Sequence, residues 1–341
     1  MLDKVVHIKK KEYHVYKEYK MEMSKNIPLK EQTPLADKNW FKTGGNARFY
    51  IAPNSTKSFQ AAVSYANSNN LDLFLLGQGA NILISDDGFD GLVIHPHMTN
   101  ISHESSDKQH ILVHAGAGVS IENLITYCLQ NNITGLEEFS GIPGTVGGSV
   151  YINIHYFQFF LSQFLVGGTV IDRKSSATID VDKNWFQFGY DTSTLMIKDH
   201  YLASATFKLK KASDIETAHA RGRSQEIIRH RNARYPQANT CGSFFRNFLE
   251  NEVTDTIAGT DKKMIYVGYY LDKVGIKGAL RQGGAVVSHK HANMIVNTEN
   301  ATSTDIIDLA REMQCKVKEA FGIVPQPECQ LIGFKKYPLL R

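Results

Sequence analysis

The chain has 341 residues, of which 42% are hydrophobic and 21% charged, an ordinary composition for a soluble globular protein. This length allows two or three domains with separate cores. The formal net charge of +4 is not gathered into a basic stripe, which argues against nucleic acid and suits small anionic ligands. No apolar run reaches the roughly 18 residues that span a membrane.

The first 28 residues are rich in lysine but lack the continuous apolar stretch of a secretion signal. We therefore predict a basic N-terminal extension over residues 1–28 and a cytoplasmic protein. The cysteines form no CxxC pair, so the sequence suggests neither a disulfide framework nor a zinc site. They are Cys128, Cys241, Cys315 and Cys329.

Short β-type runs then alternate with helical patterns. Residues 71–85 predict a buried strand, a glycine turn and a second strand, and residues 110–120 predict a strand that ends in small residues. Ser120 is placed as the N-cap of a helix with apolar residues at helical spacing. Further strands are predicted over residues 164–172 and 200–210.

The pattern changes after Lys211, where we predict a domain boundary. Ser213 and Glu216 form a capping-box pattern that opens a long basic helix, which ends before Tyr235-Pro236. A last amphipathic helix is predicted over residues 304–321, with Gly322 as its stop.

Three glycine-bearing segments lie at residues 41–49 (FKTGGNARF), 76–85 (LGQGANILIS) and 140–153 (SGIPGTVGGSVYIN). Glycine lets backbone approach a ligand closely and leaves N–H groups pointing outward, as phosphate sites require. Any one segment alone is typical of a tight turn. Together they indicate a large diphosphate-bearing cofactor, although no complete GxGxxG pattern supports a Rossmann site.

Taken in order, these segments and four others resemble the UDP-N-acetylenolpyruvoylglucosamine reductase family over residues 32–333. The further motifs are FGYDTS, CGSFFRN, GGAVVSHKHANMIVN and FGIVPQPECQLIG. The resemblance implies an α+β fold with a two-subdomain FAD-binding module of the vanillyl-alcohol-oxidase (PCMH) type, followed by a smaller α+β substrate-binding domain. The expected FAD-binding domain covers residues 29–211, with subdomains of about 29–100 and 101–211, and the substrate domain covers 212–341.

The function implied by the resemblance is the NADPH-dependent, FAD-mediated reduction of UDP-N-acetylglucosamine enolpyruvate to UDP-N-acetylmuramate, for peptidoglycan. FAD would be bound non-covalently and NADPH would be a co-substrate. The partner would be a small nucleotide-sugar, with no nucleic acid, membrane or metal involved, and a monomer is favoured. Flavin contacts are implied at Gly77, Gly79, Ala80, Asn81, Gly141, Ile142, Pro143, Gly144, Thr145, Gly147 and Gly148.

The resemblance makes Ser243 the proton donor and Glu328 a second catalytic group that works protonated, its pKa raised by burial. From the residues alone, Gly-Ser is turn chemistry, the adjoining phenylalanines belong to a core, and Glu328 is a surface acid. The predicted substrate contacts are Asn247, Arg246, Arg231 and Tyr190. Arg231 and Arg234 could bind a diphosphate or simply cap a helix.

Two departures from the family pattern stand out. Asp191 occupies the arginine position of Phe-Gly-Tyr-Arg-x-Ser, where the family's guanidinium helps to stabilise an enolate; such a loss typically costs about 3–4 kcal/mol of barrier. We hypothesise that Arg246 or Arg281 supplies the charge and that Asp191 turns away.

The second departure is the bulky aromatic segment at residues 154–164, which replaces a loop rich in glycine and alanine. It either packs as core or narrows the pocket. His289 and His291 are interpreted as structural polar residues rather than a metal pair.

Two other functions stay open at this point. One is a flavin oxidase or dehydrogenase of the same cofactor fold, which the retained Ser243, Asn247 and Glu328 disfavour. The other is a flavin-binding pseudoenzyme whose missing arginine marks lost catalysis.

Overall fold

A computed structural model describes residues 28–197, 199–237 and 239–341, so residues 1–27 of the predicted extension lie outside the described residues. The chain divides into two compact units. Unit 1 comprises the described residues up to Thr33 with Ala47–Gly77 and Asp90–Gln225, and unit 2 comprises Pro34–Asn46, Gln78–Phe89 and Glu226–Arg341. The domain boundary predicted near residue 211 stays a prediction; the two compact units divide between Gln225 and Glu226.

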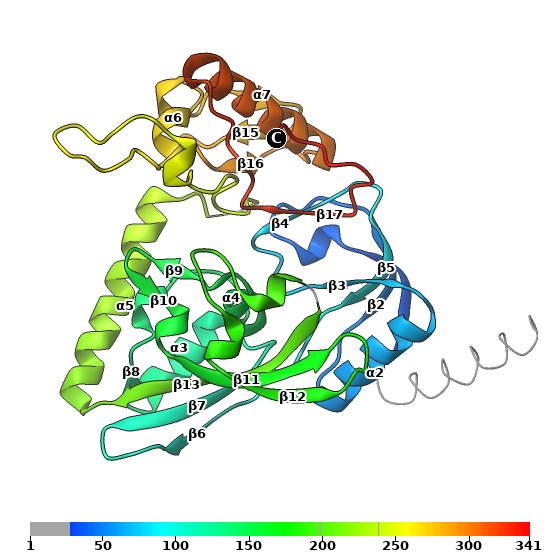
Figure 1. The fold of residues 1–341 in the computed structure, drawn as a ribbon, viewed down its shortest axis with the longest axis vertical. Helices are drawn as coiled ribbons and strands as arrows, with labels where there is room; N and C mark the ends of the chain where they lie inside the picture. Colours follow the sequence, from blue (N-terminus) through cyan, green and yellow to red (C-terminus); the bar gives the residue numbers. More distant parts are fainter. Residues whose placement is uncertain (1–27, 198, 238) are drawn as a thin grey trace, which may run out of the picture. The chain divides into compact units, whose positions relative to one another are not determined.

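The larger sheet of unit 1 has six strands in the order β12-β11-β13-β7-β6, with β8 paired to β13 (Figure 1). Its members are β6 (Ile101–Ser105), β7 (His110–Gly116), β8 (Ile133–Thr134), β11 (Leu165–Asp172), β12 (Thr178–Asp182) and β13 (His200–Lys211). These bounds confirm the strands predicted over 110–120, 164–172 and 200–210. The pairings are antiparallel.

Two helices, α3 (Ile121–Gln130) and α4 (Val146–Ile152), pack on this sheet through one apolar core. Ser120 caps α3 as predicted, because its hydroxyl accepts the N–H of Asn123 at 3.1 Å. The apolar face of α3 is buried, and this burial stabilises a helix of only ten residues that would be marginal alone. A two-stranded hairpin, β9 (His155–Tyr156) with β10 (Phe159–Phe160), follows α4.

A second core of unit 1 lies beneath a four-stranded sheet in the order β1-β2-β5-β3 and the helix α2. The elements are β1 (Lys30–Pro34), β2 (Asn46–Ile51), β3 (Asp72–Leu75), β5 (Phe89–Ile94) and α2 (Thr56–Ser68). Phe59 and Val63 of α2 are fully buried against this sheet's strands. Strands β3 and β4 (Ile82–Ile84), with a turn between them, confirm the two strands predicted over residues 71–85. The prediction that the first strand is buried is wrong, because β3 is exposed at Asp72 and half-buried at its other residues, whereas β4 is buried.

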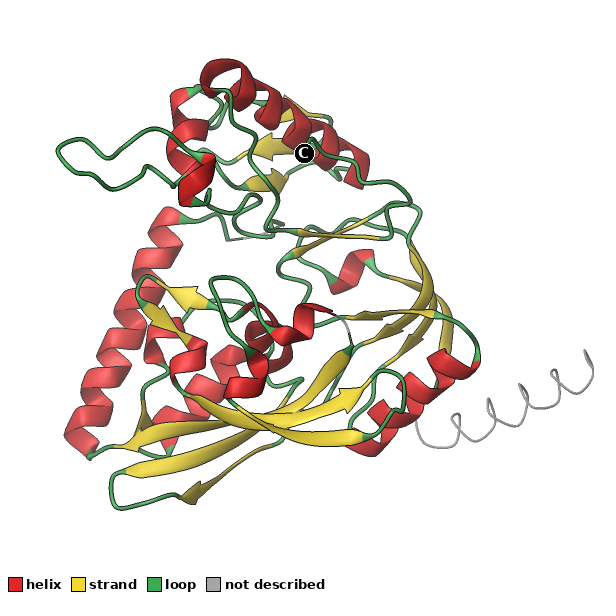
Figure 2. Cartoon of the chain, in the orientation of Figure 1, coloured by secondary structure: helices red, strands yellow, loops and turns green. Residues whose placement is uncertain are grey.

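Unit 2 has its own core beneath a three-stranded sheet, β14 (Arg281–Gln282), β15 (Ala285–Val287) and β16 (Ile295–Asn297). Helices α6 (Val267–Lys273) and α7 (Ser303–Phe321) contribute to that core, and β17 (Gln330–Ile332) pairs in parallel with β4 (Figure 2). Gly322 ends α7 in the left-handed conformation, with φ +71°, as predicted.

The long basic helix α5 (Asp214–Arg234) carries the boundary between the units. Its predicted capping box is present: the Ser213 hydroxyl accepts the N–H of Glu216 at 3.3 Å, and the Glu216 carboxylate accepts the N–H of Ser213 at 2.8 Å. Short 3-10 helices complete the described chain at Ala36–Lys38, Glu137–Phe139, Leu161–Gln163, Asn184–Phe186, Thr194–Ile197 and Glu250–Glu252.

Candidate active site

The segment that carries Ser243 lies on the core of unit 2. Phe244 and Phe245 are fully buried in that core, whereas Ser243 is half-buried. The phenylalanines are therefore core residues, as the residues alone suggested, and they anchor the backbone of the adjoining serine. A hydroxyl in this place is held by a packed segment rather than by a mobile turn.

The Glu328 segment pairs directly with the Ser243 segment. The backbone N–H of Glu328 donates to the carbonyl of Phe244 at 2.9 Å, and Phe245 forms an antiparallel bridge with Pro327. The backbone N–H of Arg246 donates to the carbonyl of Gln326 at 2.9 Å, continuing the ladder. This pairing brings the two predicted catalytic residues, a hydroxyl and a carboxyl far apart in the sequence, onto adjacent backbones about 5 Å apart.

The strand-turn predicted to contact flavin joins the same part of unit 2. Asn81 Nδ2 donates to the carbonyl of Glu328 at 3.5 Å, and the Gln330 N–H donates to the carbonyl of Asn81 at 3.1 Å. Gly79 has φ +66°, and a Cβ there would lie 2.5 Å from the carbonyl of Lys38, so only glycine fits. Within unit 2 the fold thus gathers Asn81, Ser243 and Glu328.

The second predicted flavin segment opens α4 in unit 1. Thr145 is the N-cap, and its hydroxyl accepts the N–H of Gly148 at 3.2 Å. The N–H of Val146 donates to Val119, and that of Gly147 donates to Ala117 at 2.9 Å. The expectation that these glycines point their N–H groups outward is therefore wrong for Gly147 and Gly148, because the first turn of α4 is bonded within the protein.

These glycines instead permit close packing. A Cβ at Gly147 would lie 3.1 Å from the carbonyl of Ala117, and one at Gly77 would lie 2.9 Å from the hydroxyl oxygen of Thr145. Gly144 has φ +150°, a conformation that side-chain-bearing residues rarely adopt. Glycine is therefore required at these positions, as the sequence indicated. The reason is close packing against other parts of the protein rather than close approach to a ligand.

Two buried polar atoms test whether these segments suit a polar cofactor. Ser149, 1% exposed, has a hydroxyl with no hydrogen-bond partner among the described residues, and a Cβ at Gly144 would approach it to 3.3 Å. Asn81 Oδ1 is likewise buried without a partner in the described part of the chain. Since buried polar groups are nearly always paired, both segments fit a ligand that supplies hydrogen bonds, as FAD does.

The two departures from the family pattern meet in unit 1. Asp191, with φ +51°, faces His155, whose Nδ1 lies 3.2 Å from Asp191 Oδ1. Tyr190 is 50% exposed, and its ring centroid lies 4.7 Å from that of His155. The aromatic segment at residues 154–164 divides: Tyr156 is buried, whereas Phe157 is 63% exposed.

Arg246 is held by an acid partner that the sequence did not indicate. Its guanidinium donates to both carboxylate oxygens of Glu252, at 2.8 and 2.7 Å, and to the carbonyl of Asn247. These hydrogen bonds raise the pKa of Arg246 and, in return, lower that of Glu252. Asn247 Oδ1 accepts the N–H of Val267 at 3.3 Å. The hypothesis that Arg246 or Arg281 replaces the missing arginine stays a prediction. In this structure the guanidinium of Arg246 forms an ion pair with Glu252.

The end of α5 shows how its arginines are used. The guanidinium carbons of Arg231 and Arg234 lie 5.0 and 5.6 Å from the ring centroid of Tyr235, a cation–π arrangement. Lys290 Nζ donates to the carbonyl of Asn232 at 2.9 Å and so caps the helix.

Burial lowers the pKa of His291, and within the described residues no group of three or more His, Cys, Asp or Glu could hold a metal. No described helix is long and apolar enough to cross a membrane.

Comparisons with known proteins decide the family. Residues 234–332 match the profile of the UDP-N-acetylenolpyruvoylglucosamine reductase C-terminal domain, and residues 47–179 match an FAD binding domain. A UDP-N-acetylenolpyruvoylglucosamine reductase of Synechococcus sp. (strain RCC307) is 33% identical over 92% of this chain and 97% of its own. The chain belongs to the UDP-N-acetylenolpyruvoylglucosamine reductase family. One of Trichormus variabilis is 33% identical over 90% of this chain and 87% of its own.

A solved UDP-N-acetylenolpyruvylglucosamine reductase (MurB) structure from Thermus caldophilus has the same fold, with a TM-score of 0.70 at 24% identity over 90% of this chain and 98% of that one. The predicted family, the α+β fold with its FAD-binding module and the FAD cofactor are thereby confirmed. In this family an arginine is expected at position 191, whereas this chain has Asp191 paired with His155. The chemical role of this pair therefore has to be explained.

Proposed function

We propose that this protein reduces UDP-N-acetylglucosamine enolpyruvate to UDP-N-acetylmuramate, with bound FAD and NADPH as co-substrate, in the synthesis of peptidoglycan precursors. Family membership supports the reaction. The backbone pairing of the Ser243 segment with the Glu328 segment supports assigning the reaction to these two residues. That pairing brings the backbones that carry Ser243 and Glu328 next to each other, and the reaction requires one hydroxyl and one carboxyl group.

When bound, FAD would supply the hydride-transfer chemistry between NADPH and C3 of the enolpyruvyl group. The residues proposed to hold it are those of the two glycine segments, Gly77, Gly79–Asn81 and Gly141–Gly148, together with Ser149. The buried hydroxyl of Ser149 and the buried Oδ1 of Asn81 are suited to hydrogen-bond polar groups of this cofactor.

Hydride addition at C3 leaves negative charge on C2 and on the adjoining carboxylate of the substrate. Ser243 then gives its hydroxyl proton to C2, a step that a positioned donor typically accelerates by about 10²–10⁴. Glu328 in its protonated form donates a hydrogen bond to the charged oxygen. Phe244 and Phe245, which follow Ser243, are fully buried and anchor the backbone of this segment.

The remaining contacts are proposed for the substrate's nucleotide and sugar. We propose that four residues bind them: Asn247, Tyr190, Arg246 and Arg231. The side chain of Asn247 is oriented by the N–H of Val267. We further propose a FAD-binding domain over 29–211 and a substrate-binding domain over 212–341; the profile matches at 47–179 and 234–332 fall within those ranges and support this division. A cytoplasmic enzyme without a nucleic-acid partner is proposed from cysteine usage, composition and charge.

Stopped-flow spectroscopy under anaerobic conditions tests the function. NADPH should bleach the flavin absorbance of the purified protein, and UDP-N-acetylglucosamine enolpyruvate alone should restore it, with UDP-N-acetylmuramate as product. Restoration by oxygen but not by this substrate would establish a flavin oxidase instead. A protein that NADPH does not bleach would be a flavin-binding pseudoenzyme.

A further inference from the structure

His155 lies in a fixed environment next to Asp191. Its Nδ1 is 3.2 Å from Asp191 Oδ1, and the two side chains are 25% and 21% exposed. The ring of Phe160 stacks on the imidazole at 5.3 Å with an interplanar angle of 26°, and Tyr190 lies against it at 4.7 Å. The imidazole is therefore held by a carboxylate and by two aromatic rings.

The turn that carries Asp191 is tied to the segment around His155 by further bonds. Asn153 Nδ2 donates to the carbonyl of Gly189 at 2.9 Å, and the Ser193 hydroxyl donates to the carbonyl of Tyr151 at 2.6 Å. Asp191 itself has φ +51°, an uncommon conformation for a residue with a side chain, which persists only where its surroundings determine it. These contacts fix the carboxylate against His155.

The chain path connects His155 to the flavin segment through a single short helix. Helix α4 (Val146–Ile152) begins at Thr145 within that segment, and seven helical residues span only about 10 Å. Asn153 ends the helix in the left-handed conformation, and the hairpin of β9 and β10 with His155 follows at once (Figure 1).

The reaction requires a hydrogen-bond donor for the negative charge that grows on the substrate's carboxylate. A protonated imidazole carries N–H groups on both nitrogens. In that form, with Nδ1 facing Asp191, Nε2–H is the second donor of the ring. Arg246 is less suited to this task, because both of its terminal nitrogens already donate to Glu252, at 2.8 and 2.7 Å, and that carboxylate offsets the charge of the guanidinium.

We infer that His155 is a catalytic residue of this protein: its Nε2 donates to the carboxylate of the enolpyruvyl substrate, and Asp191 is the residue that positions the ring. This inference rests on the proposed function. It explains why an acid can stand at position 191, because that acid faces a basic side chain instead of the substrate's anion. The charge lost with the family's arginine is supplied by a residue of the aromatic segment.

Single-turnover kinetics of the FAD-loaded protein test the inference. His155→Gln should lower the rate of substrate-dependent flavin reoxidation by about 10², with FAD content and the rate of bleaching by NADPH unchanged. Asp191→Asn should give a smaller loss, and His155→Arg should recover part of the activity that His155→Gln loses. A wild-type protein that the enolpyruvyl substrate does not reoxidise would instead refute the proposed function itself.

The matched control is another His–Asp pair of unit 1. His200 Nε2 lies 3.4 Å from Asp172 Oδ2, with side chains 22% and 24% exposed, and Trp185 packs against the ring at 5.1 Å. His200→Gln removes a contact of the same kind and should leave reoxidation at the wild-type rate. Equal rates for His155→Gln and His200→Gln would overturn the inference.

A second measurement does not depend on the folding of any variant. A crystal structure of the wild-type, FAD-loaded protein with UDP-N-acetylmuramate should place His155 Nε2 about 2.8 Å from a carboxylate oxygen of the product. A product carboxylate bound by other donors, with His155 out of hydrogen-bond reach, would also overturn the inference.

Discussion

Asn293 holds the backbone of Phe245 by two hydrogen bonds at once. Its Nδ2 donates to the carbonyl of Phe245 at 2.7 Å, and its Oδ1 accepts the N–H of Phe245 at 3.0 Å. The backbone carbonyl of Asn293 also accepts the N–H of Phe244 at 2.8 Å. A single side chain thus substitutes for a neighbouring strand beside Ser243, on the edge opposite the ladder to Glu328.

Replacing this amide should destabilise the protein. Asn293 is 2% exposed, so Asn293→Ala leaves a buried N–H and a buried carbonyl of Phe245 without partners. We expect a loss of about 2–4 kcal/mol in the free energy of unfolding, measured in urea. The exposed Asn251 is the control, and Asn251→Ala should change stability by no more than about 0.5 kcal/mol. Equal losses in both variants would contradict the structural role of the Asn293 side chain.

Ser243→Ala should separate the two halves of the reaction. The change removes the proposed proton donor and leaves Phe244 and Phe245 packed in the core. We expect turnover to fall by about 10²–10⁴, while the rate at which NADPH bleaches the flavin stays at the wild-type value. Steady-state and stopped-flow measurements together give both quantities. A fully active Ser243→Ala protein would remove Ser243 from the mechanism.

Gly79→Ala should impair both folding and flavin retention. The new Cβ would lie 2.5 Å from the carbonyl of Lys38, and φ +66° is unfavourable for alanine, which by itself costs about 1–3 kcal/mol. We expect a lower melting temperature and a lower ratio of flavin to protein absorbance. Gly222→Ala is the control: a Cβ there meets nothing within 4 Å, and in helix α5 alanine should add about 0.5–1 kcal/mol of stability. Retention of full flavin by the Gly79 variant would contradict the close packing of this turn.

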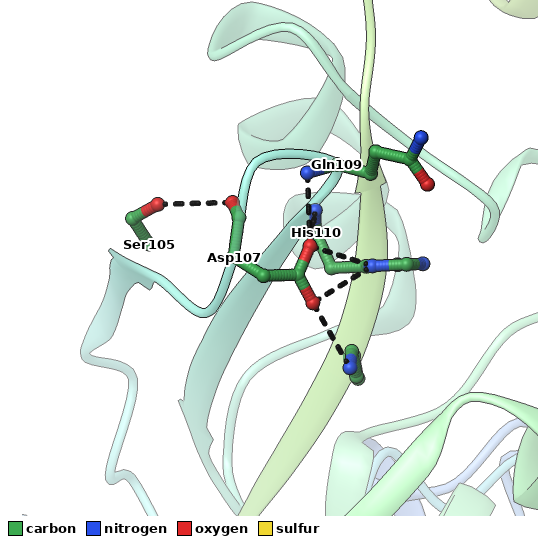
Figure 3. A network of polar contacts seen from close by, with 5 residues as sticks. Ser105, Asp107, Gln109 and His110 are labelled. Carbon is green, nitrogen blue, oxygen red and sulfur yellow. Dashed lines mark hydrogen bonds and ion pairs between the residues drawn. The ribbon is translucent and has the colours of Figure 1, made fainter.

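Asp107 should contribute stability that acid removes. Its Oδ1 accepts the N–H groups of Gln109 and His110 at 2.8 and 2.9 Å, and its carboxylate faces the His110 ring and Lys208 Nζ (Figure 3). The backbone hydrogen bond from Gln109, followed by the side-chain bond from His110, holds the pKa of Asp107 well below its usual range.

A carboxyl whose pKa is lowered by folding contributes stability that is fully present above its unfolded pKa of about 4, and this stability is lost progressively as the pH falls from that value through the lowered folded-state pKa. The melting temperatures of wild type and Asp107→Asn should therefore differ by a constant amount above about pH 5, and the difference should start to shrink below about pH 4 and keep shrinking as the pH falls through the lowered folded-state pKa. Asp180→Asn, a change in another exposed strand carboxylate of unit 1, serves as the comparison. A difference that persists unchanged to pH 3 would show that Asp107 acts through shape and not through charge.

Local structure could be predicted from the sequence because caps and periodicity act over one turn. Ser120 caps α3 through an N–H three residues away, and Gly322 ends α7 because it adopts a positive φ at little cost. The glycine segments and the Ser243 motif also marked the family, since their residue types recur in a fixed order. These features depend on near neighbours or on the motif itself.

Tertiary structure alone decided which distant side chains meet. Three contacts join segments that no spacing rule connects. They are the backbone hydrogen bond between Phe244 and Glu328, the hydrogen bonds of the Asn293 side chain to Phe245, and the pairing of Asp191 with His155. Such contacts follow from strand register and from the packing of whole cores, which involve many residues at once. The sequence by itself therefore determined the local elements and the reactive groups, and folding determined the neighbours that give those groups their chemistry.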